Sequence, residues 1–349
     1  MILIIIEPII QCVCLIIIIQ YITSKYKLYF CREFARKERN DSLGWSYLIR
    51  LPIIGSIFLV SMFFYPDIVV YCLKFVYLFL FIQSSALLIR PILISCFDKI
   101  HISLSEIMSY IISFIVVFIP SILCYFNINW ITIDIICCVF SIYTQSSLLF
   151  EKINVPMILN IAMLFYDLFW VFGSKKVPVF EGKSVMEENA MTSVKHNLAM
   201  MLTFKGIITH SVSFLGMGDI IVPGFITIFC VGIDHFLKTK YFIWTTIGHI
   251  LGLIIADICV IVFQSGQPAL IYIVPSIVIM FIIYGIKTHT LKQAIQINLK
   301  EEFLKEKKEN EMNTIEPEFE INEPFEIIPE VIENEGETIV VDTQKEYED

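Results

Sequence analysis

Residues 206–232 of this chain read GIITHSVSFLGMGDIIVPGFITIFCVG, and stretches of this kind decide its fold. A transmembrane helix needs about 20 mostly apolar residues, and this stretch reaches that length although it contains the carboxylate of Asp219. Eight further stretches are long and apolar enough to span a bilayer. The nine predicted spans are approximately residues 1–22, 47–65, 68–89, 105–126, 131–150, 156–173, 206–232, 241–263 and 268–286. We therefore predict an all-α polytopic membrane protein with about nine transmembrane helices.

The composition of the chain agrees with a membrane protein. Of its 349 residues, 57% are hydrophobic and 17% are charged, whereas a soluble globular chain has about 45–50% apolar and about 25% charged residues. Residues 301–349 hold 18 of the 34 acidic residues but only 4 of the 25 Lys and Arg. A soluble enzyme and a basic nucleic-acid-binding protein are both poor interpretations. The ten cysteines form no CxxC pair, so we expect neither a disulfide framework nor a zinc site.

The distribution of Lys and Arg predicts the orientation of the spans, because cytoplasmic loops are enriched in these residues. The link after the first span carries six of them, the links after the third, fifth, seventh and ninth spans are also basic, and those after the second, fourth and eighth have none. We therefore predict a lumenal N-terminus and a cytosolic C-terminus. The sixth link, residues 174–205, is an exception, because it contains five Lys although it must be lumenal.

The chain divides into three predicted regions. Residues 1–150 form an N-terminal five-helix membrane region, residues 151–287 a second membrane region that carries the functional carboxylates, and residues 288–349 a charged, largely disordered cytosolic tail. Residues 1–22 lack a positively charged start and a small-residue cleavage site, so we expect an uncleaved anchor. The tail is expected to be disordered because its acidic, proline-containing composition cannot bury enough apolar surface.

Carboxylates inside the spans are the most informative side chains. A charge near the bilayer centre costs somewhere between about 2.5 and 17 kcal/mol, so an acid at that depth indicates a function. Glu7, Glu106 and Asp134 lie close to predicted span ends, where we expect them to reach water. Asp167 and Asp219 lie deep in two consecutive spans. A rise of about 1.5 Å per residue places these two acids roughly 17 and 20 Å from the cytosolic ends of their helices, nearly at one level.

Two carboxylates at one level of a membrane protein have a specific chemistry. They cannot both ionise cheaply when they are close, so one holds a proton and the other stays anionic. Such a pair can activate a water molecule as general base and protonate a carbonyl oxygen or a leaving amine as general acid. Asp167 and Asp219 therefore predict the chemistry of an aspartic protease inside a membrane, which needs no metal and no cofactor.

The residues around Asp219 support a special backbone geometry there. Gly216 and Gly218 stand directly before it, and glycine permits close backbone approach and extended geometry beside a substrate. Pro223-Gly224 follows one turn later and is expected to bend the cytosolic half of the span. The last span opens with a further short motif, Gln267-Pro268-Ala269-Leu270.

Three stretches together resemble the YD, GxGD and PAL motifs of the signal peptide peptidase family, the intramembrane aspartyl proteases that also include the presenilins. They are FYDLFWVFG at 165–173, LGMGDIIVPG at 215–224 and QPALIYIVP at 267–275. Their order and spacing agree with the family over roughly residues 155–286, whereas the first five spans match only in hydropathy. The resemblance implies that Asp167 and Asp219 are the catalytic dyad, and that the flanking motif residues shape the substrate site: Tyr166, Gly216, Gly218, Gln267, Pro268, Ala269 and Leu270.

The resemblance also implies a substrate class and a location. Family members cleave transmembrane helices within the bilayer, and the predicted orientation is opposite to that of the presenilins. No large lumenal domain precedes the first span, so we expect the chain to resemble the endoplasmic reticulum enzyme, a multi-pass protein whose substrates are chiefly remnant signal peptides. Expected partners are these membrane-embedded helices and the lipid bilayer, together with a possible second copy or degradation-complex proteins, and no nucleic acid.

Four features depart from the family pattern. Met217 replaces the usual leucine of the GxGD motif, a volume-conserving change. A charged insertion at 174–188 precedes a stretch at 189–194 that resembles a conserved family segment. The C-terminus lacks a dilysine retrieval signal. Asp257 lies in the eighth span, where it either contacts neighbouring helices, pairs with His249 or supports the dyad.

Two other functions fit parts of the pattern. A transporter or channel could relay protons or cations through Asp167, Asp219 and Asp257, since intramembrane acids and broken helices are typical of such proteins. No internal repeat relates the two halves of this chain, which argues against that interpretation. A membrane scaffold could instead hold helices for degradation partners through the acidic tail.

Overall fold

The computed structural model describes residues 2–36, 45–99, 105–126, 129–205, 212–263 and 267–315. It divides the chain into a compact unit, residues 1–307, and a second unit, residues 308–349.

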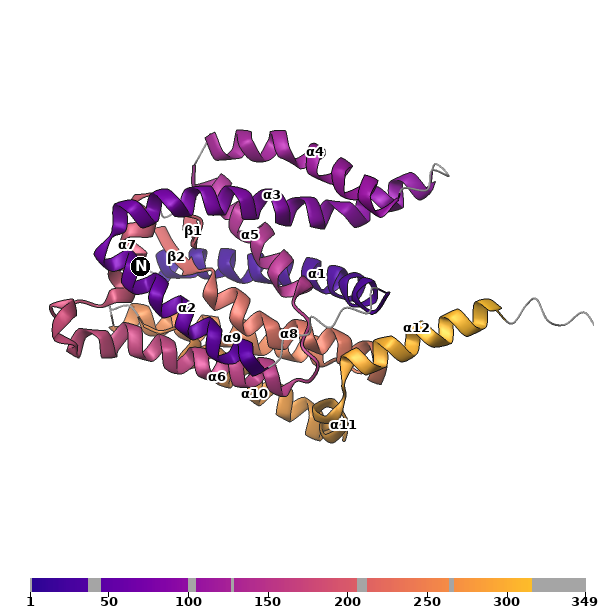
Figure 1. The fold of residues 1–349 in the computed structure, drawn as a ribbon. Helices are drawn as coiled ribbons and strands as arrows, with labels where there is room; N and C mark the ends of the chain where they lie inside the picture. The colour runs from indigo at the N-terminus through magenta and orange to yellow at the C-terminus, as the bar shows by residue number, and fades with distance from the viewer. Residues whose placement is uncertain are drawn as a thin grey trace, which may run out of the picture. The chain divides into compact units, whose positions relative to one another are not determined.

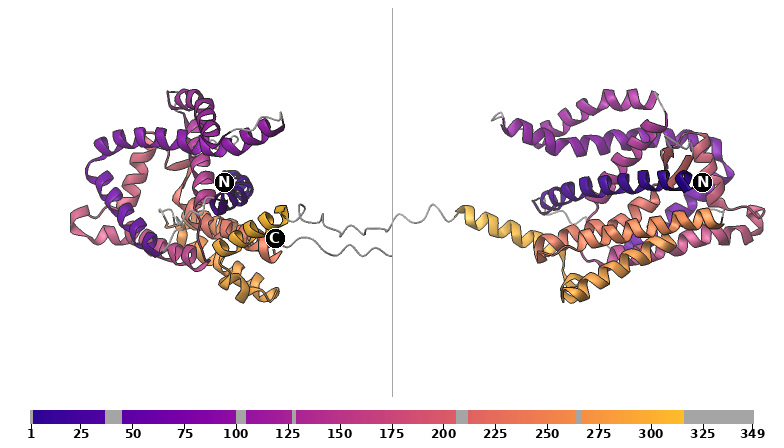
Figure 2. Two further views of the ribbon diagram at one scale, coloured as in Figure 1. Left: turned by 45° about the vertical axis from the view of Figure 1, so that its right-hand side comes forward. Right: turned by 180° about the vertical axis from the view of Figure 1, so that it is seen from behind.

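A helix forms in each of the nine predicted stretches, and most of these helices run alongside one another (Figures 1 and 2). Six helical segments of the described residues are long and apolar enough to cross a membrane, and two shorter apolar helices accompany them. The all-helical polytopic fold class is thus confirmed. The nine helices are α1 (Ile2–Arg36), α2 (Trp45–Phe64), α3 (Pro66–Lys99), α4 (Glu106–Phe126), α5 (Trp130–Ser147), α6 (Asn154–Leu168), α8 (Gly218–Leu237), α9 (Tyr241–Phe263) and α10 (Leu270–Lys287).

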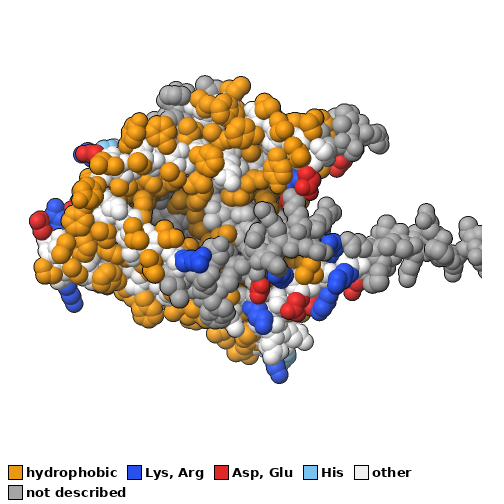
Figure 3. Space-filling model, in the orientation of Figure 1, with side chains coloured by type: hydrophobic (Ala, Val, Ile, Leu, Met, Phe, Trp, Pro, Cys, Tyr) orange, Lys and Arg blue, Asp and Glu red, His pale blue; other side chains and the backbone are white. Residues whose placement is uncertain are grey.

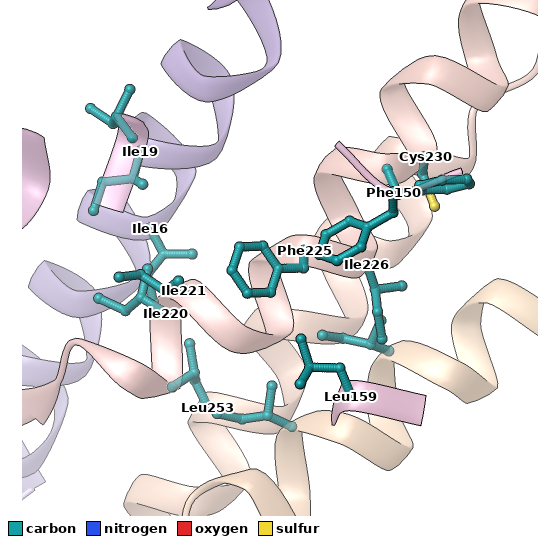
Figure 4. Packing of buried hydrophobic residues seen from close by; sticks show 14 of the residues in the cluster. Ile16, Ile19, Phe150, Leu159, Ile220, Ile221, Phe225, Ile226, Cys230 and Leu253 are labelled. Atoms are coloured by element: carbon teal, nitrogen blue, oxygen red, sulfur yellow. The ribbon is translucent and has the colours of Figure 1, made fainter. Parts of the chain in front are cut away.

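Helix α8 is the centre of the bundle. Of the residues in the most apolar 18-residue stretch of α8, 72% are buried inside the bundle. The share is 28–39% for the other membrane-length helices. Helices α1, α5, α6, α9 and α10 all pack against it. Figure 4 shows Ile16 and Ile19 of α1 beside Ile220 and Ile221 at the start of α8, all in one buried cluster. The helix that carries Asp219 is therefore held on several sides.

The outer surface of the bundle is apolar. Hydrophobic side chains cover most of the face in Figure 3, and charged side chains gather mainly towards its ends. Helix α9 illustrates the pattern, since Ile243, Leu251 and Ile255 are exposed whereas Gly248 and Gly252 are buried against α10. A face of exposed large aliphatic residues is what a helix presents to lipid.

The seventh predicted span is wrong in its first part. A helix was predicted from residue 206, but the structure has an antiparallel hairpin of β1 (Met201–Lys205) and β2 (Val212–Gly216), and α8 begins only at Gly218. The backbone N–H of Thr203 in β1 donates to Asp134 Oδ1 of α5 at 2.8 Å, which anchors the hairpin to the bundle. Apolar content alone does not separate a short strand from a helix. Residues 206–211, including His210, lie outside the described residues.

The long sixth link also contains ordered structure. Helix α6 continues as a π-helical turn, η1 (Phe169–Gly173), and two short 3-10 turns, η2 (Ser174–Lys176) and η3 (Pro178–Phe180), lead to α7 (Val185–Lys195). Asn189 of α7 donates to the carbonyl of Leu59 in α2 at 2.9 Å. Within the charged insertion, Phe180 and Val185 are buried in one cluster with Leu59 of α2. The insertion therefore packs on the bundle through apolar side chains.

Two helices follow the last span, α11 (Leu291–Gln296) and α12 (Leu299–Ile315). Leu299 donates its backbone N–H to the backbone carbonyl of Glu151 at 3.0 Å, and its side chain fills the space left by Gly232 of α8. Phe303 stacks on His235 near the end of α8. The compact unit therefore continues past residue 287 to Lys307.

Candidate active site

Asp167 and Asp219 come together inside the bundle. Asp167 is the penultimate residue of α6 and is 6% exposed, and Asp219 is the second residue of α8 and is half-buried. The two carboxylates are close enough for their charges to interact directly. The prediction of one common level assumed that both acids lie in mid-helix. Asp219 instead lies in a first helical turn, because the chain before Gly218 is extended.

Each carboxylate lies near a helix N-terminus, Asp219 near that of its own helix α8 and Asp167 near that of α10. Asp219 is in the first turn of α8. Asp167 accepts a hydrogen bond from the backbone N–H of Leu270, the first residue of α10. Free N–H groups and the helix dipole favour negative charge at this end of a helix. The motif at residues 267–270 thus contacts Asp167 through the backbone N–H group of Leu270.

The rest of that motif leads into α10. Pro268 is buried, Gln267 and Ala269 are half-buried, and Ala269 is the residue that precedes the helix. The carbonyls of Pro268 and Ala269 accept the backbone N–H groups of Ile271 and Tyr272. This turn therefore fixes the direction in which Leu270 points its N–H group.

The two glycines before Asp219 have different surroundings. A Cβ atom on Gly216 would lie 2.9 Å from Asp219 Oδ2, so only glycine leaves room for the carboxylate in this position. A Cβ atom on Gly218 would have no neighbour within 4 Å among the described residues. Open space therefore lies beside the backbone next to Asp219.

Tyr166 is directed towards α2. Its hydroxyl forms a hydrogen bond with Ser56, and Gly55 leaves room for it, since a Cβ atom there would lie 2.8 Å from the hydroxyl oxygen. The Tyr166 ring also contacts Trp170 edge-on, with ring centroids 6.2 Å apart. The tyrosine therefore joins α6 to α2 beside Asp167.

We expect Tyr166→Phe and Ser56→Ala each to lower the stability of the protein by about 1 kcal/mol, because each removes one partner of a partly buried hydrogen bond. The double variant should cost little more than either single variant. Thermal unfolding of the detergent-solubilised protein measures these values. Additive costs would show that the two hydroxyls stabilise the fold independently.

The other intramembrane polar residues have separate places. Asp134 anchors the hairpin, and Asp257 is half-buried in α9, near Cys12 of α1. His249 does not pair with Asp257, since its Nε2 lies 3.2 Å from the backbone carbonyl oxygen of Asp219 and its Nδ1 has no partner among the described residues. Sequence reasoning missed this contact, although a proline inside a helix signals an unpaired carbonyl four residues earlier.

No group of three or more His, Cys, Asp or Glu in the described part of the chain could hold a metal ion. Within those residues the polar centre of the bundle consists of the two carboxylates and the amide, hydroxyl and imidazole groups around α8. What this arrangement can do chemically is transfer protons between two adjacent carboxyl groups and a third reactant.

The fold and the site define a polytopic membrane protein with a pair of adjacent carboxylates enclosed among its helices. Residues 35–301, more than half of the chain, match the model of the signal peptide peptidase family. The chain belongs to this family.

Several curated relatives are similar to the chain. Signal peptide peptidase-like 2B of Mus musculus is 30% identical over 159 residues, 42% of this chain and 27% of the relative. A probable intramembrane protease of Saccharomyces cerevisiae is 26% identical over 201 residues, 52% of this chain and 33% of the relative. Signal peptide peptidase-like 2A of Homo sapiens is 30% identical over 158 residues, 42% of this chain and 30% of the relative. The matches thus span about a third or less of these relatives' length.

Proposed function

We propose that this protein is an intramembrane aspartic endopeptidase that cleaves transmembrane helices with water activated between Asp167 and Asp219. The observation that carries the proposal is the proximity of two carboxylates from consecutive membrane helices, which lie close enough for their charges to interact. Membership of the signal peptide peptidase family supports it, and one of the similar proteins is itself named a probable intramembrane protease.

The proposed reaction follows from the sharing of one proton by the pair. The anionic carboxylate takes a proton from water as the water attacks the scissile carbonyl, and the protonated one donates its proton to the carbonyl oxygen. When the tetrahedral gem-diol collapses, the leaving amine takes a proton from the pair and a hydroxyl of the gem-diol returns one, so the pair again holds a single proton. The helix N-termini at Asp219 and Asp167 stabilise the negative charge that the pair keeps throughout. The protonation states belong to the pair rather than to one aspartate.

A substrate helix hides its amides in its own hydrogen bonds, so it must unwind before water can attack. The unwound segment then needs new partners, and an exposed strand edge provides them. Strand β2 ends at Gly216, just before Asp219, and its residues Val212 and Phe214 are exposed. We propose that the unwound segment enters the open space beside Gly218 along this strand.

The proposed substrates are membrane-embedded helices, chiefly remnant signal peptides, and the proposed location is the endoplasmic reticulum membrane. The basis is the sequence resemblance together with the family match. Substrates with helix-breaking residues in their apolar core should be cleaved best, because less work is needed to unwind them.

The experiment that tests the proposal is cleavage of a synthetic signal peptide by the full-length protein, purified in detergent and assayed with and without a transition-state analogue of aspartic proteases. We expect a cut inside the apolar core of the peptide that the analogue abolishes. A folded protein that neither cleaves a panel of signal peptides nor binds the analogue, in detergent and in lipid vesicles, would contradict the proposal. Proton-coupled uptake into vesicles that is lost in Asp257→Asn would favour a transporter instead.

A further inference from the structure

Pro223 lies inside α8 and changes the hydrogen bonding of the turn that carries Asp219. In an α-helix each carbonyl accepts from the N–H group four residues later, and proline has no N–H. The carbonyl of Asp219 therefore has no donor at position 223. His249 of α9 fills this place, because its Nε2 atom lies 3.2 Å from the carbonyl oxygen.

Two further buried side chains bind carbonyls of the same segment. Gln145 of α5 donates to the carbonyl of Ile220 at 3.3 Å, and Asn160 of α6 donates to that of Val222 at 2.9 Å. Both side chains are almost completely inaccessible to solvent. Three helices that surround α8 thus each supply one hydrogen-bond donor to the backbone around Pro223.

The amide of Gln145 is itself held in one orientation. Gln20 of α1 donates to its Oε1 at 3.2 Å, and Thr227 of α8 donates to Gln20 Oε1 at 2.9 Å. A Cβ atom on Gly224 would overlap the Gln145 amide, so glycine at this position allows its approach. These hydrogen bonds form a chain that starts at Ile220 of α8, runs through Gln145 and Gln20, and returns to α8 at Thr227.

His249 makes a contact that packing alone does not explain. Its side chain is 0% exposed, its Nδ1 atom has no partner in the described part of the chain, and Nε2 faces a carbonyl oxygen, which can only accept. The ring is therefore a donor at Nε2. A buried polar atom without a partner costs free energy, and an aliphatic side chain would avoid that cost. The Asp219 carbonyl is the one partner that the imidazole gains in return.

We propose that His249 and Gln145 are positioning residues, which hold the backbone carbonyls of Asp219 and Ile220 and thereby fix the carboxylate of Asp219 against that of Asp167. This inference rests on the proposed function of the two aspartates. Pro223 leaves the carbonyl of Asp219 without its helical N–H donor, and His249 replaces that donor from α9. Gln145 adds a second hydrogen bond from outside the helix, to the next carbonyl. A displacement of about 1 Å at a reacting group can cost about 10²-fold in rate.

The first test compares three variants of the full-length protein. His249→Leu removes the donor and keeps the volume, His249→Gln keeps an N–H group near the position of Nε2, and Thr246→Val removes a hydroxyl of α9 that bonds within its own helix. We expect His249→Leu to lower kcat about 10- to 100-fold, with KM and thermal stability nearly unchanged and a parallel loss of affinity for the transition-state analogue. His249→Gln should recover most of the activity, and Thr246→Val should behave as the wild type.

The second test restores the helical hydrogen bond to the Asp219 carbonyl that Pro223 prevents. Pro223→Ala restores an N–H group that can bond to the Asp219 carbonyl, so His249→Leu should cost much less in this background than in the wild type. Equal losses in the two backgrounds, or wild-type kcat in His249→Leu, would overturn the inference. These outcomes differ from failure of the proposed function, in which the wild-type protein itself neither cleaves the signal peptide nor binds the analogue.

Discussion

Asp219→Asn is expected to reduce cleavage of a signal peptide by about 10²–10⁴-fold, the range of a general acid–base group. Asparagine has nearly the same size and shape as aspartate, but it neither holds a negative charge nor exchanges a proton. Asp167→Asn should have an effect of similar size. The double variant should lose little more than either single variant, because groups that act as a unit are strongly non-additive.

The matched control for this prediction is Asp257→Asn, which also removes an intramembrane acid. Asp257 lies in α9 and is half-buried, as Asp219 is. We expect this variant to cleave at the wild-type rate. Initial rates with a purified signal peptide are measured for the wild type and all four variants, and thermal unfolding shows that each is folded. Cleavage by Asp219→Asn at the wild-type rate would exclude the carboxylate pair as the catalytic group.

Gly252→Val is expected to destabilise the protein by about 1–3 kcal/mol, the usual cost of an overpacked contact. A Cβ atom at this position would lie 2.5 Å from the Cα atom of Ile273 and 2.9 Å from the carbonyl oxygen of Tyr272. These are backbone atoms of α10, so the contact cannot be relieved by a side-chain rotation. Gly248, one turn earlier, makes a similar approach to Ser276. Small residues four apart allow two membrane helices to pack this closely.

The same variant should also lose activity. Helix α10 begins at Leu270, whose N–H group bonds to Asp167, so a shift of α10 away from α9 moves this donor. Leu251→Val is the matched control, because Leu251 is on the exposed face of the same helix. Thermal unfolding in detergent and cleavage rates measure both effects. Wild-type stability and activity in Gly252→Val would show that α9 and α10 separate without consequence for the site.

Local sequence determined much of the fold. In lipid a helix must satisfy its own backbone hydrogen bonds, so an apolar stretch of sufficient length is enough to place it, and helices form in all nine stretches. The exception is instructive. Residues 212–216 are apolar, but Gly216 and Gly218 interrupt the helical pattern, and pairing with Met201–Lys205 produced strand β2. Such pairing depends on residues distant in sequence.

The sequence also identified the candidate aspartates, because a carboxylate in an apolar span is costly and therefore conspicuous. It did not reveal that each lies near a helix N-terminus, since the start of α8 at Gly218 is set by the hairpin before it and the approach of Leu270 to Asp167 by the packing of α10. That Asp167 and Asp219 work as a catalytic pair stays a prediction for the experiments above.

The sequence by itself thus determined the apolar spans, the two acids and the missing N–H group at Pro223, each of which is a property of a few neighbouring residues. Only the tertiary structure decided which side chains donate hydrogen bonds to the backbone carbonyls near Pro223. The carbonyl of Asp219 meets His249, 30 residues away in sequence, and that of Ile220 meets Gln145, 75 residues away. The identity of these donors depends on which helices pack against the start of α8, because a buried backbone carbonyl needs a hydrogen-bond donor and tertiary packing brings that donor near.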